Sequence, residues 1–309
     1  MKKVLVTGAA GSIGIQVLKY LLSEGKYEIT ALDLKNKKTQ KNLKKYRRRI
    51  NIIYGDINDS LLMEALVRDH DYIIHLAGVV PPLGDFSRKA GEIIDYLGTE
   101  NIIKAINYYN SECFLIYAST TSIYEDKLEV TTKDKINVDN LSNYSFNKFN
   151  TENLIKKKLK NYTIFRLPFI LNNFKNEPFI LNIKRNTIVE ASTTFDVAYA
   201  FVKAIDCKKQ INKKIFNVGM GEHGRIKYDL ILKKLLINYG ISFKYILSRV
   251  FLEKNYHSPI LLDSDELDNI IHYRNDSLYN YFNRLKRKGK KRRLQKLLAK
   301  PLIWLKNKE

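Results

Sequence analysis

The chain has 309 residues, with 54 lysines and arginines against 32 acids and a formal net charge of +22. Because 45% of its residues are hydrophobic, it can bury a sizeable core, which excludes wholesale disorder. Two cysteines cannot form a disulfide framework, the five histidines lack metal-binding spacing, and no apolar run approaches the roughly 18 residues that a membrane-spanning helix needs. We expect a soluble, cytoplasmic protein without a bound metal.

The first half of the chain alternates short apolar runs with helical patterns. Near-continuous apolar strands that alternate with helices are typical of a parallel sheet covered on both faces. We therefore predict an α/β fold with a doubly wound parallel sheet. The predicted strands lie at 4–6, 29–33, 52–54, 72–76, 114–118 and 162–167, and the predicted helices near 12–24, 59–69, 91–109 and 142–159.

The second half of the chain is less regular and has no Ser/Pro-rich linker. Its clearest elements are a helix near 196–206, a strand near 215–218 and a helix near 226–238. We predict two domains that share an interleaved chain. The large domain comprises 1–167 with 191–218 returning to it, a small domain comprises 168–190 and 219–283, and a basic tail comprises 284–309.

A glycine-rich loop, with Gly8, Gly11 and Gly14, joins the first strand to the first helix. Glycine permits a tight turn and the close approach of a pyrophosphate, and the helix N-terminus presents free N–H groups to the phosphates. Asp33 ends the second strand, 19 residues after Gly14, where a carboxylate can accept hydrogen bonds from ribose hydroxyls. Strand, loop, helix and acid together predict a dinucleotide site in a Rossmann-type large domain.

The identity of the dinucleotide depends on the residues after the second strand. Asp33 favours NAD, because a carboxylate would repel the extra phosphate of NADP. Lys35, Lys37 and Lys38 follow it and would attract that phosphate. NAD is the prediction and NADP is the open alternative.

A phenol and an ammonium group lie four residues apart at Tyr144 and Lys148. On one helical face, the lysine can lower the pKa of the phenol and so equip tyrosine to exchange a proton with a substrate hydroxyl or carbonyl. Tyr199 and Lys203 share the spacing, but they lie in a run of aromatic and aliphatic residues that is typical of packing. We assign the chemistry to Tyr144, which follows the hydroxyl-rich turn at 119–122.

Several motifs recur in one known family. The sequence TGAAGSIG at 7–14 is similar to a TGxxGxxG loop, and Tyr144, Lys148 and Glu152 follow a YxxxKxxxE pattern. From residue 2 to about 283 the chain resembles the extended short-chain dehydrogenase/reductase family, the NAD-dependent epimerase/dehydratases. The other segments that carry the resemblance are Gly55-Asp56, His75-Leu76-Ala77-Gly78, Ser119 to Tyr124, Phe195-Asp196-Val197-Ala198 and Asn217-Val218-Gly219.

The resemblance implies roles for individual residues. Tyr144 would be the acid/base, Lys148 would lower its pKa and hold the nicotinamide ribose, and Thr120 would hydrogen-bond the reacting oxygen. The cofactor would supply or remove the hydride. The residues implied to contact the cofactor are Gly8, Gly11, Ser12, Ile13, Gly14, Asp33, Asp56, Ile57, Leu76, Ala77, Gly78, Tyr144, Lys148 and Pro168.

Departures from the family pattern bear on the substrate. Family dehydratases carry Asp-Glu after the catalytic threonine, whereas this chain has Thr121 and Ser122, which argues against dehydration. Only 27 residues separate Pro168 from Asp196, where sugar-nucleotide enzymes of the family carry a longer insert. A nucleotide-sugar site is therefore either absent or built from other residues, such as Arg225 and Lys227. The candidate substrate residues are Val80, Thr121 and Arg225.

The tail at 284–309 contains twelve basic residues and one acid. Leu294, Leu297 and Leu298 recur at helical spacing and Trp304 follows, which is typical of an in-plane anchor on an anionic membrane surface. The alternatives are a terminal helix docked on the body and, less favoured, nucleic-acid binding.

These observations predict an NAD(P)-dependent oxidoreductase or epimerase with a Thr/Tyr/Lys triad. It would act on a secondary alcohol of a sugar-like, nucleotide-activated substrate, as a homodimer, in polysaccharide synthesis beside a membrane. Two alternatives remain open: an NADPH-dependent ketone reductase with a non-nucleotide substrate, and a non-catalytic dinucleotide-binding module recruited to a membrane or partner.

Overall fold

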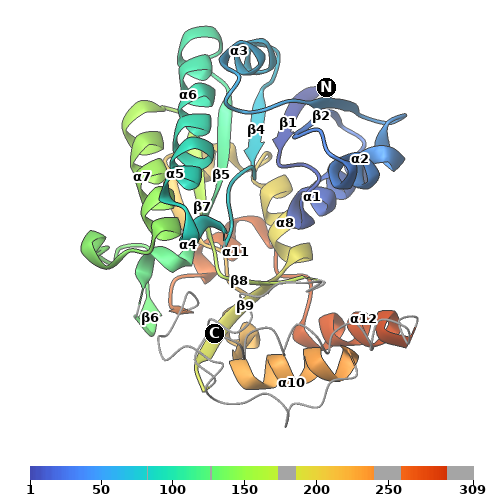
Figure 1. The fold of residues 1–309 in the computed structure, drawn as a ribbon, viewed down its shortest axis with the longest axis vertical. Helices are drawn as coiled ribbons and strands as arrows, with labels where there is room; N and C mark the ends of the chain where they lie inside the picture. The colour runs from blue at the N-terminus through green and yellow to red at the C-terminus, as the bar shows by residue number, and fades with distance from the viewer. Residues whose placement is uncertain (82, 126, 173–185, 240–258, 291–309) are drawn as a thin grey trace.

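The computed structural model describes residues 1–81, 83–125, 127–172, 186–239 and 259–290 (Figure 1). Its centre is a seven-stranded sheet with the order β10-β7-β5-β4-β1-β2-β3, and every neighbouring pair is parallel. The doubly wound parallel sheet predicted from the sequence is confirmed. The strands are β1 (Lys2–Thr7), β2 (Tyr27–Asp33), β3 (Asn51–Tyr54), β4 (Tyr72–His75), β5 (Phe114–Thr120), β7 (Tyr162–Leu167) and β10 (Lys214–Asn217).

The strand order reverses at β1, which pairs with β2 on one side and β4 on the other. Strands β2 and β3 extend the sheet on one side of β1, and β4, β5, β7 and β10 extend it on the other. The loops that follow β1 and β4 therefore lead to opposite sides. In open α/β sheets, ligands bind in the crevice that opens at this switch point. The sheet therefore positions the loops after Thr7, Asp33 and His75 around one crevice.

Helices cover both faces of the sheet (Figure 1). One face packs against α1 (Ser12–Glu24) and α8 (Thr194–Lys203), which contribute Val17, Leu21 and Phe201 to a buried apolar cluster. The other face packs against α3 (Ser60–Arg68), α6 (Gly98–Tyr109) and α7 (Asn143–Lys158). Strands such as β4 are buried along their whole length, which explains their continuous apolar sequence.

The basic stretch after β2 forms α2 (Lys37–Leu43), followed by the 3₁₀ turn η1 (Lys44–Tyr46). Asn36 starts the helix because its side chain accepts from the backbone N–H of Thr39, whose hydroxyl in turn receives the backbone N–H of Asn36. Helix α2 lies beside the glycine-rich loop, where the Asn42 side chain donates to the Ala10 carbonyl at 3.0 Å.

A smaller unit lies below the main sheet (Figure 1). Its three-stranded sheet has the order β11-β9-β8, with β8 (Phe169–Leu171), β9 (Ile188–Thr193) and β11 (Arg225–Lys227). Helices α10 (Tyr228–Tyr239) and α12 (Leu278–Lys290) pack on it through an apolar cluster that includes Tyr228, Leu232 and Phe282. Helix α11 (Asp265–Ile271) instead contributes Leu267 and Ile271 to the core of the main sheet.

Short elements complete the described chain. They are α4 (Leu83–Phe86), α5 (Arg88–Gly91), the π-helical turn η2 (Glu92–Leu97), η3 (Thr121–Tyr124), η4 (Val138–Asn140), α9 (Lys208–Ile211), η6 (Gly221–Gly224), and the paired strands β6 (Glu129–Val130) and β12 (Ile260–Leu261).

The predicted basic tail begins inside α12, where Arg284 pairs with Asp276 and Leu285 packs against the small unit. Residues 291–309, which include Leu294, Leu297, Leu298 and Trp304, lie outside the described residues. In the part of the chain that the structure describes, no helix is both long and apolar enough to cross a membrane. Across the same residues, no group of three or more His, Cys, Asp or Glu side chains could hold a metal ion.

Candidate active site

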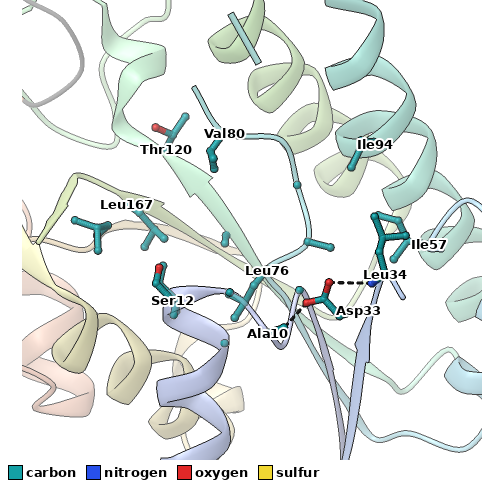
Figure 2. A pocket seen from close by; sticks show the side chains of 18 of the residues that line it. Ala10, Ser12, Asp33, Leu34, Ile57, Leu76, Val80, Ile94, Thr120 and Leu167 are labelled. Carbon is teal, nitrogen blue, oxygen red and sulfur yellow. Dashed lines mark hydrogen bonds between the residues drawn. The ribbon is translucent and has the colours of Figure 1, made fainter. Parts of the chain in front are cut away.

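A cavity of about 650 Å³ opens at the carboxyl ends of the central strands. Its walls come from the loops after β1, β2, β3 and β4, the end of β5, the first turns of α7 and the segment that joins β7 to β8. Figure 2 shows Thr120 and Val80 toward one end and Asp33 and Ile57 toward the other. The volume lies in the range of sites for small molecules and cofactors.

The glycine loop forms the floor of the cavity. Gly8 has φ +66°, and a Cβ there would lie 2.7 Å from the backbone nitrogen of Ala77. A Cβ on Gly14 would lie 2.5 Å from the carbonyl oxygen of Gly8. Only glycine fits at both places, and the loop thereby directs the N-terminus of α1, which begins at Ser12, into the cavity. Its free N–H groups and dipole favour an anionic group such as a pyrophosphate.

Asp33 closes one end of the cavity. Its Oδ2 atom accepts from the backbone N–H of Ala10 at 2.8 Å, and its Oδ1 atom accepts from that of Leu34 at 2.8 Å (Figure 2). These bonds fix the carboxylate, and each oxygen keeps a lone pair that can accept from a hydroxyl group. Lys38 also lines this end, next to Asn36 and Thr39 at the start of α2.

The next wall contains the other predicted cofactor residues. Asp56 is exposed, and its Oδ1 atom accepts from the backbone N–H of Asn58 at 2.9 Å. Ile57 is buried and presents an apolar surface. Leu76, Ala77, Gly78 and Pro168 line the cavity as well, as do Ser12 and Ile13. The structure thus brings every predicted cofactor residue to one cavity. Its apolar side chains, fixed carboxylate and helix N-terminus fit a dinucleotide.

The opposite end holds the three predicted catalytic residues. The Thr120 Oγ1 atom lies 2.8 Å from the Ser122 Oγ atom and accepts from the Ser122 backbone N–H at 3.2 Å. Tyr144 lies one helical turn before Lys148 on α7 and lines the same cavity as Thr120. Ser142 starts this helix by accepting from the backbone N–H of Ser145 at 3.2 Å. The cap fixes where Tyr144 enters the cavity.

Burial raises the pKa of the Tyr144 phenol, and the carboxylates of Asp95 and Asp85 act in the same direction. Lys148 and the Thr120 hydroxyl lower this pKa but do not offset the burial. The sequence-based expectation considered only the lysine. In the protein without ligand, the phenol of Tyr144 is therefore protonated at neutral pH.

The lysine itself is turned inward. Its Nζ atom lies 3.0 Å from Asp95 Oδ1, and it donates to the Ala118 carbonyl at 3.2 Å and to the Tyr117 hydroxyl at 3.3 Å. The interaction with Asp95 raises the pKa of Lys148 in spite of its burial. Lys148 therefore carries a full positive charge at the wall of the cavity.

A second buried ion pair supports this end from behind. Glu152, one turn after Lys148, accepts from Arg166 at 2.7 Å and 3.0 Å and from the Ser119 hydroxyl at 2.5 Å. Arg166 also donates to the hydroxyl of Tyr124 at 2.8 Å. These bonds tie α7 to β5 and β7 and fix the backbone on both sides of Thr120.

The predicted substrate residues have separate locations. Val80 lines the cavity and is 65% exposed. Thr121 is fully buried, and its hydroxyl donates to the Leu167 carbonyl at 3.4 Å. Arg225 lies on β11 and pairs with Glu190 and Glu222. Of the three, the structure places only Val80 on the described cavity wall.

Several lining residues had no assignment from the sequence. Asn36 and Thr39 carry a detectable signal, since the spacing of a capping box is visible in the sequence. Others come from loops and strand ends without a local motif, among them Leu34, Pro81, Ile94, Phe169, Ile170 and Asn172.

Residues 4–176 match the profile described as "NAD dependent epimerase/dehydratase family". This match covers more than half of the 309 residues. The chain belongs to this family. The predicted family resemblance is thereby confirmed, and so is NAD as the cofactor on which the family depends.

The similar proteins include a CDP-paratose 2-epimerase from Salmonella typhi, 27% identical over 255 residues that span 72% of this chain and 70% of that protein. A UDP-glucuronic acid 4-epimerase variant from Bacillus cereus, in complex with NAD and UDP-4-deoxy-4-fluoro-glucuronic acid, has a TM-score of 0.77 at 20% identity and covers 94% of this chain and 99% of its own. The UDP-Glc/GlcNAc 4-epimerase of Campylobacter jejuni has a TM-score of 0.78 at 17% identity, with coverages of 94% and 99%. The two structural likenesses establish the shared fold.

Proposed function

We propose that the protein is an NAD-dependent epimerase that acts on a secondary alcohol of a nucleotide-activated sugar. The observation that carries the proposal is the convergence of Thr120, Tyr144 and Lys148 at one end of a cavity whose other end has the glycine loop and Asp33. The cavity thus combines a cofactor-shaped cradle with proton-carrying side chains where a second molecule can enter.

The three side chains would perform the proton transfer. When bound, NAD supplies the site that accepts a hydride from the alcohol carbon and returns it. The phenolate form of Tyr144 takes the hydroxyl proton of the substrate, and the resulting phenol returns it to the keto oxygen. Lys148 favours the phenolate through its positive charge, and Thr120 holds the reacting oxygen.

The residues at this end support epimerisation over dehydration. Among the described residues that line the cavity, the only carboxylates are Asp33 and Asp56, and both belong to the cofactor end. Thr121 and Ser122, where family dehydratases carry two acids, are uncharged, and Thr121 is directed into the protein. Removal of a carbon-bound proton and loss of a hydroxyl would have no acid at the reacting end.

The substrate class is supported by the similar proteins. The names of the relatives above include CDP- and UDP-linked sugars. These relatives are epimerases that act at carbon 2 or at carbon 4 of the sugar. Val80, Phe169 and Asn172 lie on the wall of the same cavity as Thr120 and Tyr144. We propose a nucleoside diphosphate sugar as the substrate class.

The test is turnover of a panel of CDP-, UDP- and dTDP-sugars, followed by proton NMR of the sugar ring. We expect one epimer pair to equilibrate without net loss of NAD, and we expect Tyr144→Phe to reduce the rate by about 10²–10⁴-fold while NAD still binds. Tyr199→Phe is the matched control, because Tyr199 has the same spacing to a lysine but packs against Tyr20 at 5.4 Å between ring centroids. Its turnover should match the wild type.

Other outcomes would identify the alternatives. Stoichiometric consumption of NADPH with a ketone, and no epimerisation, would indicate the reductase. NAD binding without turnover of any sugar or ketone would indicate the non-catalytic module. Undiminished turnover in Tyr144→Phe would refute the assigned chemistry.

We also propose that the basic segment 284–309 binds an anionic membrane surface and that the protein is a homodimer. The support for the first proposal is the charge and leucine spacing of the sequence, since most of this segment lies outside the described residues. Removal of 291–309 leaves the described helix α12 intact and should abolish flotation with anionic vesicles. Equal flotation of both proteins would contradict it, and sedimentation equilibrium would test the dimer.

A further inference from the structure

A buried carboxylate stands directly behind the reacting end of the cavity. Asp95 is 1% exposed, and its Oδ1 atom lies 3.0 Å from the Nζ atom of Lys148. The ammonium group has three N–H donors, and it faces three acceptor atoms, on Asp95, Ala118 and Tyr117. Asp95 is the charged member of this set, so it contributes most to where the ammonium rests.

The ion pair occupies space that a side chain at position 78 would fill. A Cβ on Gly78 would lie 2.4 Å from Asp95 Oδ1 and 2.9 Å from Lys148 Nζ. Both distances are too short for a carbon atom beside a polar group, and Gly78 lines the cavity. The glycine therefore lets the carboxylate and the ammonium meet at the wall of the site.

The backbone around Asp95 is unusual and well held. Asp95 lies in the π-helical turn η2 between α5 and α6. Such turns are rare in proteins, and those that occur are often found at functional sites. Its carbonyl accepts from the Thr99 hydroxyl at 2.5 Å, and the Thr99 oxygen lies 3.0 Å from His75 Nε2. The other ring nitrogen of His75 lies 2.6 Å from the Thr7 hydroxyl. A buried polar chain thus anchors the turn to β1 and β4.

The charges around this turn are few. Burial lowers the pKa of His75 to about 3, so its imidazole is neutral. Burial raises the pKa of the Tyr117 phenol, which is also neutral. The remaining groups that act on Tyr144 are Asp85 on α4, Asp95 on η2 and Lys148 on its own helix.

We propose that Asp95 is a positioning residue of the catalytic site: it holds the ammonium of Lys148 at the cavity wall and offsets part of its charge. The expected effect of Asp95 on turnover rests on the proposed function. Substrate oxidation needs the phenolate of Tyr144, and Asp95 would set the pH at which that phenolate forms.

The first test follows the Tyr144 phenol directly and needs no substrate. Tyrosine labelled with ¹³C at Cζ gives one signal per residue in NMR, and the signal of Tyr144 is assigned by its loss in Tyr144→Phe. In Asp95→Asn we expect the phenol to titrate about one pH unit or more below the wild type, because the ammonium then acts without an opposing carboxylate. An unchanged titration would overturn the proposal.

The matched control is Asp196→Asn, which removes an equally buried carboxylate outside the cavity. It should leave the titration of Tyr144 where the wild type has it. A shift of the same size in this variant would show a general effect of lost negative charge and would also overturn the proposal.

The second test measures kcat/KM against pH with the sugar identified for the proposed function. The acidic limb of the profile should move in Asp95→Asn by the same interval as the phenol titration. A uniform loss of activity with an unmoved limb would indicate a purely structural role and would contradict the proposal. If the phenol titration shifts but no sugar is turned over, the proposed function fails and the role of Asp95 stands.

A second variant keeps the proposal testable if Asp95→Asn does not fold. Gly78→Ala leaves both charges in the protein but places a methyl group in the space that they share. Separation of the carboxylate from the ammonium should move the Tyr144 titration in the same direction as in Asp95→Asn. No shift in folded Gly78→Ala would contradict the proposal.

Discussion

Two buried ion pairs lie one turn apart on α7, and they differ in how completely their polar atoms are satisfied. Lys148 pairs with Asp95 of the turn η2, and Glu152 pairs with Arg166 of β7. All four side chains are at least nine-tenths buried. Their sequence positions and burial alone would not distinguish them.

The pair of Glu152 is fully hydrogen-bonded. Both carboxylate oxygens accept from Arg166, one of them accepts from Ser119 as well, and the guanidinium has a further acceptor in Tyr124. In the pair of Lys148, the Oδ2 atom of Asp95 accepts from the backbone N–H of Val79 at 3.4 Å, and its Oδ1 atom has an ion pair but no hydrogen bond among the described residues.

The difference assigns the two pairs to different tasks. A saturated network in the interior holds elements together and resists change, whereas a partly satisfied pair beside a cavity can respond to what enters it. Loss of the pair of Glu152 should therefore act on stability, and loss of the pair of Lys148 should act on chemistry.

The largest effect is expected for Lys148→Met. Without the ammonium the phenolate of Tyr144 is not favoured, so kcat/KM should fall by about 10³–10⁴-fold, equivalent to about 4–5 kcal/mol. The free energy of unfolding should change little, because burial already raises the pKa of Asp95 and the carboxyl can take up a proton. Steady-state kinetics and urea denaturation measure the two quantities. Lys157→Met, which replaces an exposed lysine of the same helix, is the control. If Lys148→Met kept a tenth of the wild-type activity, the assignment of this ion pair to the chemistry would be wrong.

The next effect is expected for Arg166→Met. Glu152 would keep the Ser119 hydroxyl but lose its cation, and an uncompensated buried charge costs about 3–4 kcal/mol of the free energy of unfolding. Activity per folded molecule should fall far less than in Lys148→Met. In the double variant Arg166→Met with Glu152→Gln, part of the stability should return because the buried charge is gone. A loss below about 1 kcal/mol in the single variant would show that this pair does not hold α7 in place.

The sheet and the cofactor end could be predicted because their signals are local. Strands β1, β2, β4, β5 and β7 are buried over most of their length, so each contains a run of mainly apolar residues. Gly8 and Gly14 are required by a single tight loop, and Asp33 follows directly at the end of a strand. Each of these features can be recognised within a short window of sequence.

The charge state of the reacting end could not be predicted in the same way. Asp95 lies 53 positions before Lys148, in a π-helical turn that the sequence pattern presents as part of one long helix at 91–109. The spacing of Tyr144 and Lys148 therefore indicated a lowered pKa for the phenol, and the structure shows a raised one, since burial, Asp95 and Asp85 all oppose the lysine. Contacts between distant elements decide that balance.

The smallest predicted effect concerns a third buried carboxylate, which lacks a cation among its described contacts. Asp196, at the start of α8, accepts from the backbone N–H groups of Asn275 and Asp276, each at 2.9 Å, and its Oδ2 atom has no hydrogen-bond partner among the described residues. Burial raises its pKa to about 7, and the nearby charges of Asp276 and Asp268 act in the same direction.

Asp196 should make the protein less stable as the pH rises. Between about pH 4 and pH 7 the folded state binds a proton at Asp196 that the unfolded state has lost, so the free energy of unfolding falls through this interval and is constant above it. From pH 5 to pH 8 the contribution is about 2–3 kcal/mol. Asp196→Asn keeps an oxygen for the two backbone N–H groups and removes the titration. Urea denaturation at both pH values should therefore show a smaller decline for Asp196→Asn than for the wild type. Parallel declines would mean that Asp196 is ionised at pH 5 and that its backbone hydrogen bonds alone stabilise the charge, which would place it with Glu152 among the satisfied carboxylates.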